Sequence, residues 1–186
     1  KNVSRFSAIA YAFGQMLSDS LNVPVGLILN AVGGSPFESW IDRRTLEFNY
    51  PGILNNWTKN DRIQDWVRER ASLNIKKSDN SQQRHPYEPC YLFESGIIPL
   101  ASYPVKGVIW YQGESNAHNK EIHEILFPLL VDSWRKNWNK EFPFYYVQLS
   151  GLNRPSWPHF RDSQRRLEKI IPGSGMVVSS DLGDSL

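Results

Sequence analysis

Apolar and polar residues along this chain fall into blocks that have the lengths of strands and helices. The most informative block is 105–116, VKGVIWYQGESN, because its apolar run 105–111 has the length of one buried strand. Five small or polar residues follow at 112–116. Ligands of α/β proteins bind at the carboxyl ends of such strands, so these residues are the first candidate site. The alternative is a polar turn in which Asn116 is the N-cap of the next helix.

A second stretch with the same plan lies nearer the start of the chain. The apolar run 25–32, VGLILNAV, predicts a strand that stops at the Gly-Gly-Ser-Pro loop 33–36. The segment 37–42, FESWID, is expected to form a short helical turn. Both stretches therefore predict a strand that ends in small residues.

Strand-like and helix-like segments alternate through the chain. Apolar runs at 142–149 and 176–180 predict two more strands. Apolar residues spaced three and four apart predict four helices, and Pro128 should kink the third. The alternation predicts an α/β fold, in which helices cover both faces of a mostly parallel sheet in three α/β/α layers. The four predicted helices are residues 6–21, 59–73, 119–139 and 156–170.

The middle of the chain gives no periodic strand. Residues 75–83, IKKSDNSQQ, are polar and predict a surface loop. Pro86 and Pro89 favour an extended backbone before them, and Pro99 should limit any helix within 91–101. We interpret this part as an insertion between two βα units that folds over the site.

Composition narrows the possible partners. The 186 residues fit one domain, and 40% hydrophobic residues are enough for a sizeable core. The net charge is +2 with scattered basic residues, so no nucleic-acid partner is expected. No apolar run has transmembrane length, so no membrane partner is expected either, and Cys90 stands alone. The seven Trp are compatible with a carbohydrate-facing surface, although core packing is the commoner use.

The residue pattern offers no metal or cofactor site. The four histidines lack ligand spacing with Cys or carboxylates and are expected to be exposed polar residues. Gly33 and Gly34 lack the third glycine and the acidic partner of a dinucleotide site. We therefore predict no metal and no cofactor. The histidines are His85, His118, His123 and His159.

The polar residues at 112–116 fit acyl transfer better than metal or cofactor chemistry. It needs a nucleophile, a base, an orienting acid and donors aimed at the developing oxyanion. Gly34 N–H and the Asn116 side chain are candidate donors, and Glu114 is a candidate acid. An obvious Ser nucleophile and His base are missing. Residues 183–186 spell GDSL, a lipase motif, but it follows the last strand instead of the first, so we treat Ser185 as a chance match.

Several segments together resemble one family, the sialate O-acetylesterases. These belong to the SGNH-hydrolase superfamily and are close to the acetylxylan esterases of carbohydrate esterase family six. The resemblance runs in order from about Phe6 to Asp184, and WYQGESNA preceded by GG-S-P-x-E-x-W is its most specific part. The matching segments are NVPVGLILNAVGGSPFESWID, LFESGIIPL, KGVIWYQGESNA, FPFYYVQL and RDSQ.

The resemblance implies a flavodoxin-like α/β/α sandwich that hydrolyses acetyl esters on carbohydrates, such as sialic acid, by a Ser/His mechanism. It also implies a secreted, periplasmic or lysosome-like location, although no signal is visible. The family's nucleophile block lies upstream of Lys1 and its histidine block downstream of Leu186. Residues 1–186 are therefore expected to be an incomplete single domain, an internal piece of a longer protein that is inactive alone.

Individual roles carry over from the family's motifs. Gly34 matches the glycine of the second block, and Glu114 is a candidate partner of the histidine. Members with Gly-x-Asn-Asp align Ser115 with their oxyanion Asn, so Ser115 and Asn116 both stay candidates. Gln112 and Gly113 join them as substrate-binding candidates, and Arg161 and Gln164 of the R-x-x-Q segment as site-shaping residues.

Two other functions stay open at this point. One is a non-catalytic carbohydrate-binding or structural domain of the same fold. The other is a lipase-like esterase that uses Ser185 with one of the four histidines. The oligomeric state and the particular sugar do not follow from the sequence.

Overall fold

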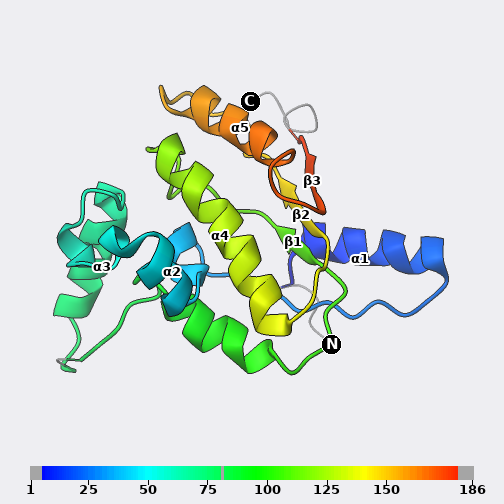
Figure 1. Cartoon of the computed structure of the whole chain (residues 1–186), viewed down its shortest axis with the longest axis horizontal. Helices are drawn as coiled ribbons and strands as arrows, with labels where there is room; N and C mark the ends of the chain where they lie inside the picture. Colours follow the sequence, from blue (N-terminus) through cyan, green and yellow to red (C-terminus); the bar gives the residue numbers. More distant parts are fainter. Residues whose placement is uncertain (1–5, 81, 180–186) are drawn as a thin grey trace. The chain divides into compact units, whose positions relative to one another are not determined.

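The computed structural model describes residues 6–80 and 82–179, which form two compact units, Lys1–Gly33 and Gly34–Leu186 (Figure 1). The first unit contains helix α1 (Ala8–Leu21). This helix begins where the Ser7 hydroxyl accepts a hydrogen bond from Ala10 N–H, and it ends at Asn22 in the left-handed conformation. The helix predicted over 6–21 is confirmed.

The strand predicted at 25–32 is wrong. These residues belong to no strand in the structure, and Ile28 and Leu29 are about half exposed. A strand is defined by hydrogen bonds to a neighbour, and within the described residues no neighbouring strand pairs with this run. An apolar run alone therefore did not determine a strand.

The second unit combines a small sheet with helices and short helical turns. Its helices are α2 (Arg43–Asn49), α3 (Asp65–Lys76), α4 (Lys120–Trp138) and α5 (Trp157–Leu167). Its strands are β1 (Val108–Trp110), β2 (Phe144–Val147) and β3 (Ser174–Val177). Its turns are η2 (Phe37–Trp40), η3 (Pro51–Ile53), η4 (Trp57–Lys59), η5 (Phe93–Ile97, a π-helix) and η6 (Ile98–Leu100).

The sheet has the strand order β1-β2-β3, and both pairs are parallel. Trp110 pairs with Tyr146, and Tyr146 pairs with Met176, so the carboxyl ends of the three strands meet at one edge. This confirms the α/β class with a parallel sheet. The strands are shorter than the predicted runs, and β3 begins at Ser174, two residues before the predicted start.

An aromatic core joins α4 to one face of the sheet. Phe127 and Trp134 of α4 both pack on Phe144 of β2, with ring centroids 5.9 Å apart in each pair. Trp110 of β1 lies 6.1 Å from the same Phe144 ring. Burial of such large rings is the main stabilising term of this layer. Tyr145, which points to the opposite face, is exposed.

Helix α5 packs against α4 and completes the layer (Figure 1). Arg166 of α5 forms an ion pair with Glu124 of α4. Both helices were predicted, and α4 has the expected ends because Asn119 caps its first turn and Asn139 ends it in the left-handed conformation. Helix α5 ends at Leu167, three residues before the predicted end at Ile170, and Ile170 is exposed.

The middle of the chain differs most from the predictions. Helix α3 starts at Asp65 instead of residue 59, because the Asn60 side chain bonds to Gly52 O and Asn55 O and holds a non-helical turn. The extended path predicted around Pro86 is a turn in which Glu88 N–H donates to His85 O.

The segment 91–101 is also more helical than expected. It contains the turns η5 and η6. Pro99 is the second residue of η6, where its missing N–H would have no partner in any case.

Candidate active site

Two loops meet at the carboxyl end of β1. One follows β1 and carries Gln112 to Asn116, and the other runs from Gly34 into η2. The Ser115 hydroxyl donates to Gly34 O at 2.8 Å, and Gln112 Nε2 donates to Ser35 O at 2.9 Å. The structure therefore brings Gly34 beside the polar edge that the sequence selected.

The Asn116 side chain lies at the centre of this junction. Its Oδ1 accepts hydrogen bonds from Phe37 N–H and from Gln112 Nε2, both at 3.0 Å. Its Nδ2 donates to Glu38 Oε2 at 3.0 Å. Asn116 is thus no helix cap, since Asn119 caps α4. Within the described residues the second Nδ2–H has no partner and stays available as a donor.

Close neighbours leave no room for a side chain at Gly34 or at Gly113. Gly34 has φ 78°, and a Cβ there would lie 2.5 Å from the Tyr87 hydroxyl and 3.0 Å from the Trp66 ring. A Cβ on Gly113 would lie 2.7 Å from the Phe160 ring. Gly34 N–H donates no hydrogen bond to another described residue, so it too is available.

Glu38 is a buried acid that the sequence reasoning missed. It is 1% exposed, and burial raises the pKa of its carboxyl to about 7, although the hydrogen bond from Asn116 lowers it. Glu38 Oε1 has no hydrogen-bond partner among the described residues. The available signal was its place as the Glu of the pattern GG-S-P-x-E-x-W, between the aromatic residues Phe37 and Trp40.

Glu114, the candidate acid, is exposed in the structure. Asn116 N–H donates to Gly113 O at 2.9 Å, which closes a turn with Glu114 at its second position. A side chain at this position points away from the turn, and Glu114 is accordingly exposed. Its predicted role toward a histidine stays a prediction.

Two of the four histidines are buried, contrary to prediction. His123 is fully buried, and desolvation lowers its pKa to about 3. Its Nδ1 lies 2.9 Å from Ser163 Oγ, while its Nε2 has no partner in the described chain. His85 is also buried. His118 and His159 are exposed, as predicted, and line a hollow of about 270 Å³ beside the loop.

The two residues of the R-x-x-Q segment hold the chain that follows β2. Gln164 Oε1 accepts from Leu149 N–H at 3.0 Å. Arg161 donates to Gln148 Oε1 at 3.0 Å, and Gln148 donates back to Arg161 O at 2.8 Å. These contacts fix the chain just past the carboxyl end of β2, next to β1. The site-shaping role of Arg161 and Gln164 stays a prediction.

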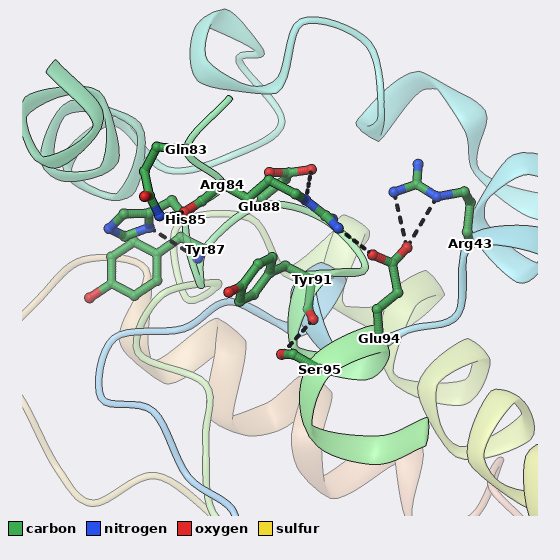
Figure 2. Close-up of polar contacts among 9 residues, drawn as sticks. All are labelled: Arg43, Gln83, Arg84, His85, Tyr87, Glu88, Tyr91, Glu94 and Ser95. Carbon is green, nitrogen blue, oxygen red and sulfur yellow. Dashed lines mark hydrogen bonds and ion pairs between the residues drawn. The ribbon is translucent and has the colours of Figure 1, made fainter. Parts of the chain in front are cut away.

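An ion-pair network runs through the segment 84–94 (Figure 2). Arg84 binds Glu88 at 2.9 Å and Glu94 at 2.6 Å, and Glu94 also binds Arg43 of α2 at 3.1 Å. Tyr87, which lies against Gly34, comes from the same segment, and its N–H donates to His85 Nδ1. The network therefore ties the wall of the site to α2.

Ser185 and the rest of the GDSL motif lie outside the described residues. Among the described residues no group of three or more His, Cys, Asp or Glu is placed to hold a metal ion. No helix of residues 6–80 and 82–179 is long and apolar enough to cross a membrane.

Comparisons with known proteins agree on one family. A family model described as "Carbohydrate esterase, sialic acid-specific acetylesterase" matches residues 3–185. The sialate O-acetylesterase of Mus musculus is 30% identical over 211 residues, which cover 98% of this chain and 38% of that protein. The Homo sapiens enzyme is 29% identical over 197 residues, or 96% of this chain and 34% of that protein. The chain thus spans little more than a third of these relatives, and it belongs to the sialic acid-specific acetylesterase family of carbohydrate esterases.

Proposed function

We propose that this chain is the part of a carbohydrate O-acetylesterase that supplies the oxyanion donors. The observation that carries the proposal is the junction in which Ser115 and Gln112 bind the Gly34 loop. The proposal is supported by two N–H groups that have no partner among the described residues, those of Gly34 and of the Asn116 amide. The substrate is an acetylated sugar, with O-acetylated sialic acid as the first candidate.

The chemistry requires stabilisation of a negatively charged oxygen. A serine hydroxyl attacks the acetyl carbonyl carbon, a histidine takes its proton, and the carbonyl oxygen becomes an oxyanion. Fixed N–H donors in a site that excludes water stabilise this charge, because they need no reorganisation when it develops. In our proposal the serine and the histidine come from other parts of the full-length polypeptide. A secreted, periplasmic or lysosome-like location belongs to the same proposal.

Ser115 and Asn116, the two candidate oxyanion donors that follow β1, differ in their hydrogen bonds. The Ser115 hydroxyl donates to Gly34 O, whereas one N–H of the Asn116 amide has no partner in the part of the chain that the structure describes. We therefore assign the donor role to Asn116 and a loop-joining role to Ser115. Gln112 orients Asn116, and Gly113 allows Phe160 to pack beneath the loop.

The test measures acetate release by the full-length protein from O-acetylated sialic acid and from acetylated xylan. Loss of one oxyanion donor typically costs about 10²–10³ in kcat, so Asn116→Ala should show such a loss with little change in KM. Asn49→Ala is the matched control, because Asn49 also donates from its amide, to Thr45 O on α2. Sugar binding without any acetate release would favour the non-catalytic carbohydrate-binding domain.

A further inference from the structure

We propose that Glu38 is a positioning residue of the esterase site, which fixes the Asn116 amide so that its second N–H faces the developing oxyanion. This inference rests on the proposed function. Glu38 is placed to act through Asn116, because its Oε2 accepts from Asn116 Nδ2 at 3.0 Å.

An asparagine amide has two orientations of almost equal shape, which differ in which end is the donor. In the structure, Oδ1 of Asn116 faces two donors, Phe37 N–H and Gln112 Nε2. Its Nδ2 faces an acceptor, the Glu38 carboxyl. The flipped orientation would place Nδ2 against these two donors, so both of their hydrogen bonds would be lost, and would turn Oδ1 toward the carboxyl.

Glu38 is itself held firmly. Its backbone carbonyl accepts from Cys90 N–H at 2.8 Å, and the adjoining Ser39 hydroxyl donates to Pro36 O at 2.7 Å. The backbone that carries the Glu38 side chain is therefore held in place, and the side chain itself is buried. The role that we propose for Glu38 is to orient the Asn116 amide and not to anchor a loop. Ser115 and Gln112 already join the two loops without Glu38.

Burying a carboxyl group is costly, and an apolar side chain in η2 would avoid the cost. Phe37 and Trp40, the first and last residues of η2, are buried without such a cost. A buried acid at this position is therefore expected to serve something other than stability, and its one described side-chain partner is Asn116.

Two conservative variants of the full-length enzyme distinguish the effect of side-chain length at position 38 from the effect of its charge. Glu38→Gln keeps the length and an acceptor oxygen, so kcat on an O-acetylated sugar should stay within about threefold of wild type. Glu38→Asp keeps the acid but is one methylene too short to reach Asn116, so kcat should fall at least about tenfold with KM nearly unchanged. The opposite order, with Asp active and Gln impaired, would show a charge role and overturn the proposal.

A double-mutant cycle tests whether Glu38 acts through Asn116. The double variant Glu38→Asp/Asn116→Ala should be no slower than Asn116→Ala alone. Losses that multiply would show independent roles and reject the inference. The matched control is Asn49→Ala, which removes a side-chain hydrogen bond to Thr45 O on α2, away from Glu38 and Asn116, and should lower the melting temperature but not kcat.

The proposed function and this inference fail in different ways. Absence of acetate release from the wild-type enzyme rejects the function. In that case the inference is judged from crystal structures of the full-length protein. The plane of the Asn116 amide should keep the same position in wild type and in Glu38→Gln, and should turn in Glu38→Asp. A fixed, unchanged amide in Glu38→Asp would overturn the inference even where the enzyme is active.

Discussion

Raising the pH should destabilise this chain through Glu38. The carboxyl keeps its proton up to a pKa of about 7 in the folded state, against 4.5 for an ordinary glutamate. Between these two values the folded chain binds more protons than the unfolded chain, so the free energy of unfolding falls as the pH rises. For one such group the loss between pH 5 and pH 8 amounts to about 2.5 kcal/mol.

The variant Glu38→Gln isolates this contribution. It cannot ionise, whereas other titrating groups, such as His123, are the same in both proteins. The assay is urea-induced unfolding at pH 5, 6, 7 and 8, followed by tryptophan fluorescence, because Trp40, Trp110 and Trp134 are buried in the core. The stability of the variant relative to wild type should rise by about 2.5 kcal/mol from pH 5 to pH 8. A difference that stays constant within about 0.5 kcal/mol would refute the burial of an acid with a raised pKa.

Three further variants test other parts of the structure. Gly34→Ala should lower the free energy of unfolding by about 1–3 kcal/mol, because φ is 78° and the new methyl group would meet the Tyr87 hydroxyl. The control is Gly33→Ala, where a Cβ has open space, and it should be nearly neutral in thermal melts. Wild type should lose stability as the pH falls from about 6.5 toward 3, the range between the unfolded and folded pKa of His123, and His123→Leu should lose less. Urea unfolding measures both, and equal acid sensitivity in variant and wild type would argue against a buried neutral imidazole. Glu114→Gln in the full-length enzyme should lower kcat strongly if its charge serves the histidine, and an unchanged kcat would leave Glu114 as a surface residue of the loop.

The elements that the sequence predicted well are those with local signals. Helix α4 has a regular apolar face and an asparagine at each end, and its predicted limits at 119 and 139 became its two caps. The run 25–32 is as apolar as the run that contains β1, yet it is not a strand. A strand needs a partner, and no local pattern states where the partner is.

In the candidate site, too, the sequence predicted the local features but not the contacts between distant parts of the chain. Gly34 and the segment from Gln112 to Asn116 were found from their sequence, because small and polar residues end two apolar runs. The direction of each side chain depends on the turn, so the exposure of Glu114 could not be predicted from spacing. Glu38 escaped notice because Asn116, to which its side chain is hydrogen-bonded, is 78 positions away along the chain.

The central claim is that Gly34 N–H and the Asn116 amide hold the oxyanion. The most direct measurement is a crystal structure of the full-length protein inhibited by a methylphosphonate that mimics the tetrahedral intermediate of acetyl transfer. We predict that the charged phosphonate oxygen lies about 2.7–3.1 Å from both Gly34 N and Asn116 Nδ2. A phosphonate oxygen bound by other donors, with Gly34 and Asn116 out of hydrogen-bond reach, would contradict the account.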